Sequence, residues 1–458
     1  MHWNHLFSAV RLGVEDRPVY SDKVRNPYQQ DYDRLIFSSP FRRLQNKTQV
    51  FPLPGSVFVH NRLTHSLEVA CVGRSLGNII GHRIADEHPD EDEDFRHFYR
   101  NEMGSVISAA CIAHDIGNPP FGHSGEKAIS TYFENLQGDL KEKLQQEFSE
   151  SQWKDLTNFE GNANGLRLLT HQFKERSSGG QRLTYTTLAA MVKYPCESSI
   201  GLDKSRKSRS KFGFFHSEKA TFQKIAEVLK LTPTSGEPLA FVRHPFVYLV
   251  EAADDICYQV IDWEDAHRLR IISTEEAQNQ LLQFFADKPS DKYQRIKNNM
   301  LRIQDMNERI GYLRAVAINS LVDECADIFW QNRDAILQGT YEKSLLDELQ
   351  GSLGEAFASL IDKSVERIYN YRPVVEIELA GYKILGGLLE EFVPAVLDRS
   401  GHQSKKLLRL LPLQFQPEGE ASSYEKVQSV VDFVSGMTDL YAVDLFRHIK
   451  GISLPELR

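Results

Sequence analysis

The chain has 458 residues, a hydrophobic content of 41% and a formal net charge of −9, so it can bury a large core in two or three domains or in one large helical unit. The negative charge balance excludes a generally basic surface, so any nucleic-acid binding has to use a local patch. No apolar run reaches the roughly 20 residues that a membrane-spanning helix needs, and the amino end lacks a basic region followed by an apolar block. We therefore expect a cytoplasmic protein with no membrane partner.

The five cysteines are odd in number, scattered along the chain and mostly placed in apolar helical runs; they are Cys71, Cys111, Cys196, Cys257 and Cys325. This distribution predicts buried thiols in a reducing compartment. Their spacing shows no zinc-binding pattern.

The first half of the chain begins with aromatic and aliphatic side chains at helical intervals in residues 26–49, which predict one or two short helices. The stretch RLTHSLEVACVGRSLGNIIGHRIADE then has apolar positions at three- and four-residue spacing over several turns, which predicts a long helix. The acidic run at residues 86–94 has the composition of a cation site or of a solvated loop, and we favour the loop.

The central stretch AACIAHDIGNPPFGHSGEKA concentrates the polar chemistry of the chain. The apolar run from Val106 to Ile116 predicts a helix with His114 and Asp115 in its last turn, before a glycine and a proline pair end it. An ionised aspartate at the end of an apolar helix is costly unless it is paired or bound to a metal. A structural role for a histidine at a helix end is the alternative.

The second part of this stretch predicts another helix, with Ser124 as its cap. Glu126 lies three residues after His123, so its carboxylate can orient the imidazole within one helical turn. The two clusters, one on each side of the turn, are therefore expected to face each other.

The middle of the chain contains two ambiguous segments. In FEGNANG, two asparagines between glycines suit a turn that presents amides to a ligand, and a plain loop-to-helix turn explains them nearly as well. The segment at residues 197–211 carries five basic side chains, Lys204, Arg206, Lys207, Arg209 and Lys211. We favour a solvated loop there over an arm that binds polyanions.

The remaining sequence predicts a strong helix over HPFVYLVEAADDICYQVIDWEDA and then amphipathic helices through residues 271–458, with few strand-like runs. The fold class that we predict is therefore all-α. No repeat of fixed period is present.

Three of the predicted helices are expected to contribute inward-facing polar residues, listed in chain order as His65, His114, Asp115 and Asp254. A mixed nitrogen and oxygen set of this kind suits Mn, Fe, Ni, Co, Zn or, less well, Mg, and it leaves coordination positions open for water and phosphate oxygens. Asp254, Tyr258 and Asp262 recur at intervals of four residues on one helix face. The alternative for each histidine is a structural role, and the alternative for the aspartate is a position that faces solvent.

These residues and the wording around them resemble a known family. The pattern of His65, the His114-Asp115 pair and Asp254 is similar to that of the HD-domain metal phosphohydrolases, and HNRLTHSLEVA, AHDIGNPPFGHSGE, FEGNANG and EAADDICYQVIDWEDA resemble the bacterial deoxyguanosine triphosphate triphosphohydrolases. The resemblance implies a helical fold with an HD-type catalytic core at residues 26–270. It also implies a C-terminal helical region, residues 271–458, that completes the site and makes oligomer contacts.

The resemblance assigns roles by position. It implies that His65, His114, Asp115 and Asp254 bind a divalent metal, with Asp254 preferred to Asp255 because only Asp254 places a tyrosine four residues later. It implies a catalytic pair, His123 and Glu126. Its softer matches are residues that bind the sugar or the phosphates, namely Gln49, Arg62, Lys193, Tyr194, Tyr258 and Asp262.

The activity implied is hydrolysis of a deoxynucleoside triphosphate, dGTP first, to the deoxynucleoside and inorganic triphosphate, with water attacking the α-phosphorus. The resemblance further implies a homo-oligomer, a hexamer by expectation, that responds to a nucleotide effector. Two alternatives stay open: another HD hydrolase acting on nucleoside monophosphates or cyclic dinucleotides, and a regulator that binds nucleotides or single-stranded nucleic acid through residues 204–211.

Overall fold

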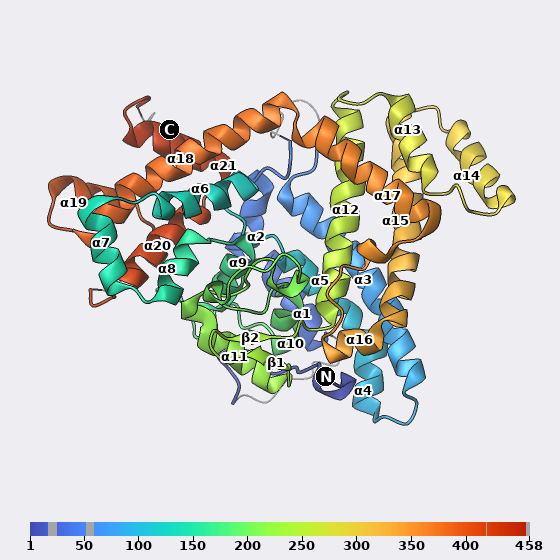
Figure 1. The fold of residues 1–458 in the computed structure, drawn as a ribbon, viewed down its shortest axis with the longest axis horizontal. Helices are drawn as coiled ribbons and strands as arrows, with labels where there is room; N and C mark the ends of the chain where they lie inside the picture. Colours follow the sequence, from blue (N-terminus) through green and yellow to red (C-terminus); the bar gives the residue numbers. More distant parts are fainter. Residues whose placement is uncertain (17–24, 52–58, 418, 455–458) are drawn as a thin grey trace.

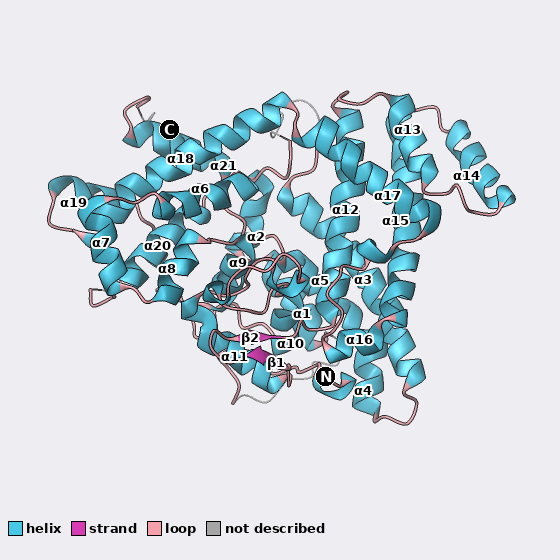
Figure 2. Cartoon of the chain, in the orientation of Figure 1, coloured by secondary structure: helices cyan, strands magenta, loops and turns pink. Residues whose placement is uncertain are grey.

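The computed structural model describes residues 1–16, 25–51, 59–417 and 419–454. In this part of the chain the protein is built almost entirely of helices, which confirms the predicted all-α class (Figures 1 and 2). Its two strands, β1 (Pro233–Ser235) and β2 (Ala240–Phe241), form a short antiparallel pair.

The helices of the first half of the chain, in order, are α1 (Pro27–Ile36), α2 (Ser39–Arg43), α3 (Arg62–Glu87), α4 (Glu93–His97), α5 (Met103–Ala113), α6 (Gly122–Glu134), α7 (Gly138–Glu147), α8 (Glu150–Thr157), α9 (Gly161–Thr170), α10 (Tyr185–Met191), α11 (Lys219–Val228) and α12 (Phe246–Arg268). The helices of the second half are α13 (Thr274–Gln283), α14 (Ser290–Arg302), α15 (Met306–Gln331), α16 (Arg333–Gln338), α17 (Gly351–Ser364), α18 (Arg372–Leu397), α19 (His402–Leu408), α20 (Ser423–Ser435) and α21 (Asp439–Ile449). Short 3-10 or π turns are η1 (Trp3–His5), η2 (Leu44–Asn46), η3 (Phe98–Glu102), η4 (Ser198–Ile200), η5 (Lys207–Arg209), η6 (His216–Glu218), η7 (Leu346–Glu348), η8 (Val365–Tyr369) and η9 (Leu413–Phe415).

Helix α3 is the long helix predicted from apolar spacing, and its start has a local cause. The side chain of Asn61 accepts a hydrogen bond from the backbone of Thr64, while the Thr64 hydroxyl lies 3.1 Å from the Asn61 amide. This capping box satisfies backbone donors that the first turn leaves free. It fixes where the helix begins, and therefore the direction in which His65, on its first turn, projects.

Helices α3 and α5 pack unusually closely because glycine lines their contact. A side-chain carbon at Gly77 would lie 2.9 Å from Ile107, and one at Gly73 would overlap Cys111. One at Gly104 would overlap the amide of Asn78. The two backbones approach through these positions, and the apolar side chains of α5 are buried in the contact.

Two local predictions around α5 and α6 need correction. Helix α5 ends at Ala113, so His114 caps it and Asp115 lies in the following turn, not in the last helical turn. Ser124 does not cap α6, which begins at Gly122 directly after Phe121 in a left-handed conformation with φ of 63°. Backbone strain at Phe121, rather than a serine cap, sets the start of this helix.

The acidic run at residues 86–94 contains the predicted loop at residues 88–92, and its two ends belong to α3 and α4. Asp92 caps α4 through the backbone amide of Phe95. Among the described residues, the run does not contribute to a group of side chains that could hold a metal.

The C-terminal helices pack against the first half of the chain rather than forming a separate layer. Helix α18 crosses α6 and α20, and α20 carries Asp432, whose carboxylate binds Arg167 of α9 at 2.8 Å. Glu218 binds the same guanidinium at 2.8 Å, and all three groups are buried. Because each buried charge depends on this pairing, the network ties the two parts of the chain together.

All five cysteines are free. Four of them are buried, as the sequence predicted, whereas Cys71 is exposed. In the described ranges, none of the helices combines the length and the hydropathy that crossing a bilayer requires.

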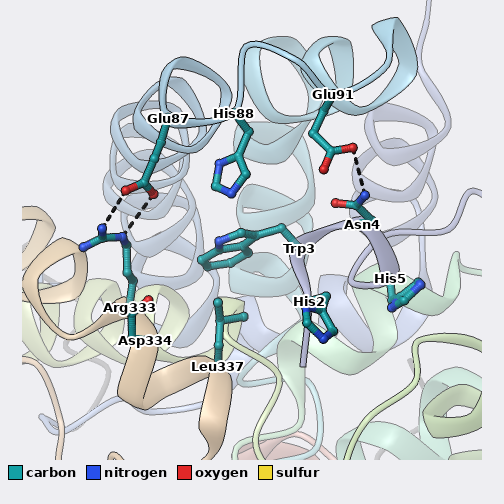
Figure 3. A pocket seen from close by; sticks show the side chains of 10 residues that line it. All are labelled: His2, Trp3, Asn4, His5, Glu87, His88, Glu91, Arg333, Asp334 and Leu337. Atoms are coloured by element: carbon teal, nitrogen blue, oxygen red, sulfur yellow. Dashed lines mark hydrogen bonds and ion pairs between the residues drawn. The ribbon is translucent and has the colours of Figure 1, made fainter.

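The N-terminal segment lies against the end of α3 and the start of α16, where it forms a cavity of about 470 Å³ (Figure 3). Figure 3 shows Glu87 binding Arg333 and Glu91 accepting a hydrogen bond from Asn4. This cavity contains none of the predicted site residues, and its two facing glutamates are already paired.

Candidate metal and catalytic site

The structure brings together three of the four predicted metal ligands. His65 comes from α3, His114 follows α5, and Asp254 lies in the middle of α12. The Nε2 atoms of His65 and His114 lie 3.2 Å and 3.3 Å from Asp254 Oδ1. Three potential ligand atoms therefore lie within 4.8 Å of one another, in a group from three helices.

The orientation of His114 favours metal binding. Its Nδ1 lies 2.6 Å from the carbonyl oxygen of Cys111, and a carbonyl only accepts, so Nδ1 carries the proton. In the neutral ring the lone pair is therefore on Nε2, which is buried and lies 3.3 Å from Asp254 Oδ1. A buried lone pair beside a carboxylate fits a divalent cation, and a backbone carbonyl that fixes the ring is a common feature of histidine ligands.

Asp115 lies at the edge of this group. Its Oδ1 is 3.7 Å from His114 Nε2, and its Oδ2 accepts a hydrogen bond of 2.8 Å from Arg62. Burial opposes ionisation, yet Arg62 and the two histidines hold the pKa of Asp115 at about 2. Asp115 is therefore a carboxylate that can complete the ligand set while Arg62 holds it.

The choice between Asp254 and Asp255 agrees with the geometry, because Asp254 is the one that contacts both histidines. Lys193 also reaches Asp254, with Nζ 2.6 Å from Oδ2. Burial alone would raise the pKa of Asp254, but Lys193 and His114 hold it well below its ordinary value. Burial and the neighbouring Glu251 and Asp254 raise the pKa of Asp255 to about 7.

The predicted pair of His123 and Glu126 is present on the first turn of α6. His123 Nδ1 lies 2.9 Å from Glu126 Oε2, and the other carboxylate oxygen accepts the backbone amide of Gly161 at 2.9 Å. The His123 side chain is 81% exposed whereas that of Glu126 is 10% exposed. Glu126 is thus a fixed acceptor, and it raises the pKa of His123 through their hydrogen bond and its charge.

A third charged group, Lys211, accompanies this pair. Its ammonium lies 3.0 Å from Glu160 and 3.9 Å from Glu126. Although burial lowers the pKa of an ammonium, the two carboxylates raise that of Lys211. A cation is therefore held beside Glu126, the carboxylate that binds His123.

The turn between the two clusters is held by the C-terminal helices. The carboxylate of Asp439, at the start of α21, accepts the backbone amides of Phe121 at 3.1 Å and Thr48 at 2.8 Å. A side-chain carbon at Gly381 of α18 would lie 2.5 Å from the Phe121 ring. The ring therefore fits against a bare patch of α18 backbone, and Asp439 holds the amide of the strained residue.

Lys47 also holds this turn, and it does so by donating to backbone carbonyl oxygens. Its buried ammonium donates to the carbonyl oxygens of Asn118 and Ser435, at 2.6 Å and 2.9 Å. Burial moves the pKa of Lys47 well below its ordinary value. The turn that separates His114 from His123 is thus linked directly to the last residue of α20.

The predicted sugar-binding residues form an aromatic and acidic patch beside His65. The Tyr258 ring lies 6.4 Å from the His65 ring and stacks on Tyr369 of η8, with centroids 5.8 Å apart. The Tyr369 hydroxyl donates to Asp262 at 3.2 Å. Burial and Asp265 raise the pKa of Asp262 well above its ordinary value.

Gln49 and Tyr194 are the two predicted substrate residues that remain. Gln49 follows Lys47 and Thr48, and its buried side-chain oxygen has no hydrogen-bond partner among the described residues. Tyr194 is buried next to Lys193, and burial raises its pKa. An orphaned oxygen at Gln49 is consistent with a contact that a bound molecule supplies.

Polar side chains from both ambiguous segments, FEGNANG and residues 197–211, make contacts within the protein. FEGNANG is not a turn before a helix, because α9 begins at Gly161; the Asn164 amide donates to Gly117 and Ser435 instead. In the basic segment, the solvated-loop prediction is wrong for the three side chains that pair within the protein: Arg206 with Glu342, Lys207 with Glu251 and Lys211 with Glu160.

Sequence reasoning missed Lys211, Tyr369 and Asp439 as site residues. Lys211 was visible only as one member of a basic run, and Tyr369 only as part of YNYRPVV. Asp439 follows a threonine that caps α21, so it resembled an ordinary first-turn acid. Each depends on a long-range contact that local spacing does not encode.

Comparison with known proteins agrees with this geometry. The HD domain family matches residues 62–176, and the phosphohydrolase-associated domain family matches residues 352–448. The chain is 38% identical to a deoxyguanosinetriphosphate triphosphohydrolase-like protein of Synechocystis, over 99% of the chain and 100% of that protein. It is 36% identical to a protein of the same name from Pseudomonas aeruginosa, over 99% and 100%. It is 29% identical to the deoxyguanosinetriphosphate triphosphohydrolase of Salmonella paratyphi A, over 93% and 94%.

The hold of Asp439 on the turn leads to a testable expectation. In Asp439→Ala, the amides of Phe121 and Thr48 lose their shared acceptor, at a cost of about 1–3 kcal/mol for each buried group. Peptides that cover residues 117–126 should then exchange backbone hydrogen faster, as measured by mass spectrometry. Asp439→Asn should give a smaller change, and the exposed Asp444→Ala on the same helix should give none. Unchanged exchange in Asp439→Ala would show that the turn is held without this carboxylate.

Proposed function

Because the chain belongs to the family of HD-domain phosphohydrolases that includes the deoxyguanosinetriphosphate triphosphohydrolase-like proteins, we propose that it hydrolyses deoxynucleoside triphosphates to the deoxynucleoside and inorganic triphosphate. The observation that carries this proposal is the convergence of two clusters. The group of His65, His114 and Asp254 is joined through Arg62 to the turn that bears His123. Arg62 binds Asp115, and its guanidinium lies 2.6 Å from where a side-chain carbon of Gly122 would be.

The metal site would be formed by the two histidines and Asp254, with Asp115 beside them. A divalent ion bound there supplies Lewis acidity at a phosphoryl oxygen and at water. Mixed imidazole and carboxylate donors suit Mn, Fe, Ni, Co or Zn, and Mg less well. The donor set supports a divalent metal, and its identity is left open.

The cations around the site suit a polyphosphate. Arg62, Lys193 and Lys211 each lie beside a carboxylate of the site, namely Asp115, Asp254 and Glu160. In the proposed mechanism they neutralise the triphosphate and hold the α-phosphorus in line for attack by water. Tyr194, next to Lys193, would add a phosphate contact.

We assign His123 the role of general acid. Glu126 raises its pKa, which favours the protonated imidazole, and its side chain is exposed toward solvent. Nδ1 faces Glu126, which leaves Nε2 to deliver a proton to the departing 5′-oxygen of the deoxynucleoside. Glu126 orients the ring and stabilises its charged form.

The sugar would lie against Tyr258, whose ring is packed between His65 and Tyr369. In this proposal the fixed ring excludes a 2′-hydroxyl, and Gln49 and Asp262 bind the 3′-hydroxyl. Base choice has no comparable structural argument, and dGTP is proposed first on the strength of the relatives' names.

We also propose that the protein acts as a homo-oligomer, a hexamer by the family resemblance, with a nucleotide as effector. Exposed apolar side chains on the C-terminal helices, such as Leu379 at 66% and Leu440 at 66%, support contacts between copies. A regulator that binds single-stranded nucleic acid through residues 204–211 has less support, because three of these basic side chains pair with carboxylates of the same chain.

The reaction and its sugar preference can be tested together. Purified protein with a divalent metal should release triphosphate, not pyrophosphate, from the four deoxynucleoside triphosphates, as resolved by ion chromatography. GTP should react at least about tenfold more slowly than dGTP, since a buried hydroxyl without a partner costs about 1–3 kcal/mol. Tyr258→Ala should reduce this preference, and Tyr371→Ala, an exposed tyrosine nearby, should retain it. Release of pyrophosphate would contradict the reaction, and equal rates for GTP and dGTP would contradict the sugar argument.

The ligand assignment predicts metal content. His114→Ala and Asp254→Ala each remove a donor from a site with few protein ligands, so both should lose bound metal and turnover together. Asp255→Ala should keep its metal, because Asp255 contacts neither histidine in the described structure. Elemental analysis of the purified variants decides the matter. Loss of metal in Asp255→Ala with retention in Asp254→Ala would reverse the assignment.

The role of His123 predicts a pH dependence. As a general acid it must be protonated, so turnover should fall as the pH rises through its raised pKa. Glu126→Gln removes the charge that raises this pKa, so the alkaline limb of the pH profile of kcat should move to lower pH. His123→Ala should bind metal and nucleotide but lose turnover by roughly 10²-fold, the scale of a positioned acid. A limb that stays in place in Glu126→Gln would exclude His123 as the titrating acid.

A further inference from the structure

A second cavity is lined by residues from α8, α9 and α20, among other segments. Its volume is about 850 Å³, and its walls come from the first half of the chain and from the C-terminal helices. This size falls in the range of pockets that bind small molecules, about 300–1,000 Å³. None of the predicted metal, catalytic or substrate residues lines it.

The wall formed by α20 contains an unsatisfied polar group. Gln428 is 1% exposed and lines the cavity, yet neither its side-chain oxygen nor its side-chain nitrogen has a hydrogen-bond partner among the described residues. Leaving a buried donor or acceptor unpaired costs about 1–3 kcal/mol each. A carboxamide held without partners is a donor and an acceptor side by side, which matches the edge of an amide or of a nucleobase.

The charges around the cavity disfavour an anion. The buried Arg167 is fully engaged, with Nε and Nη2 on Asp432 and Nη1 on Glu218. The other lining charges are Lys174 and the carboxylates Glu175, Glu420 and Glu425. Carboxylates therefore outnumber free cations, and a phosphate group would find repulsion rather than a partner.

The rest of the lining combines uncharged polar side chains with aromatic rings. Phe173 and Phe415 pack edge to face with ring centroids 5.7 Å apart, and the His171 ring lies 4.8 Å from that of Phe173. Burial and Arg167 lower the pKa of His171 to about 4, so this ring is neutral at neutral pH. Aromatic side chains beside a carboxamide suit a planar heterocycle.

We propose that this cavity binds an uncharged nucleobase, as the free base or as its deoxynucleoside, with the Gln428 carboxamide paired to the hydrogen-bonding edge of the base. The deoxynucleoside is also the uncharged product of the proposed reaction, and this connection rests on the proposed function, whereas the site itself does not. The same geometry gives the cavity no preference for one base, because each base has adjacent donors and acceptors.

The cavity and the catalytic turn share one helix. Gln428 and Asp432 face the cavity from α20, and Ser435 ends that helix. The Ser435 carbonyl accepts the ammonium of Lys47, which also holds the Asn118 carbonyl in the catalytic turn. A molecule that binds in the cavity therefore contacts α20, the same helix whose last residue, Ser435, supports the catalytic turn through Lys47.

Direct binding tests the proposal without turnover. Radiolabelled deoxyguanosine and free adenine are dialysed to equilibrium against the full-length protein after removal of metal with EDTA. Saturable binding of one ligand per chain is expected. Gln428→Met, which keeps the side-chain volume and removes both polar atoms, should weaken it at least tenfold. Gln172→Met, on the exposed rim, should leave it unchanged.

Two further comparisons separate this cavity from the catalytic site and from misfolding. Tyr258→Ala should leave the affinity unchanged, because Tyr258 lies at the metal site. In the unaltered protein, dGMP should bind at least tenfold more weakly than deoxyguanosine, a result that needs no variant to fold. The thermal midpoint of Gln428→Met confirms that the variant is folded.

The proposal is overturned if neither ligand binds saturably up to about 1 mM, an affinity too weak for a built site. It is equally overturned if Gln428→Met binds as tightly as the unaltered protein, or if Tyr258→Ala abolishes binding. If the substrate panel fails to release triphosphate while this binding persists, the proposed function fails and the site stands.

Discussion

The close approach of α3 and α5 is the constraint on which the metal cluster depends. Glycines at positions 73, 77 and 81 of α3 follow one another at four-residue intervals, and a side-chain carbon at each would collide with α5 or with the turn that precedes it. With the two backbones this near, His65 at one end of α3 and His114 at the end of α5 have ring centroids only 5.4 Å apart. Larger residues in this contact would separate the helices and, with them, the two imidazoles.

The charges at the centre are stable because each is paired. Asp254 is shared between two histidines and Lys193, and Asp115 is held by Arg62. A buried carboxylate without such partners would take up a proton. The arrangement therefore keeps two acceptors ionised in an apolar interior, which is the state that a cation requires.

Much of this was predictable from the sequence because it is encoded by local spacing. The all-α class and the long helix α3 follow from apolar periodicity, and His123 and Glu126 meet because they are three residues apart in a helix. The spacing of Asp254 and Tyr258 is likewise local, and one turn after Asp254 the Tyr258 ring lies 6.4 Å from that of His65. These features involve one helix or one turn at a time.

What the sequence did not reveal depends on contacts between distant segments. Lys211 is 85 residues from Glu126, and nothing in its basic run distinguishes it from Lys204 or Arg209. The start of α6 was predicted at Ser124 because serine is a good cap, but a carboxylate 318 residues further along the chain stabilises the left-handed Phe121 instead. Helix-capping propensity fails to predict the start of α6, because a tertiary contact supplies the hydrogen-bond acceptor that a capping side chain would otherwise provide.

The site is therefore divided between two sources of stability. The candidate metal cluster comes from α3, the end of α5 and α12, and these helices pack against one another. Its three potential ligands therefore all belong to the first half of the chain. His123 and its turn are held by Asp439, Ser435 and the bare backbone at Gly381, and these three residues belong to the second half of the chain. The buried pairing of Arg167 with Asp432 keeps the halves docked, because separating them would expose each charge without its partner. Perturbation of the C-terminal helices should thus alter proton transfer before it alters metal binding, since the turn yields while the ligand cluster keeps its own support.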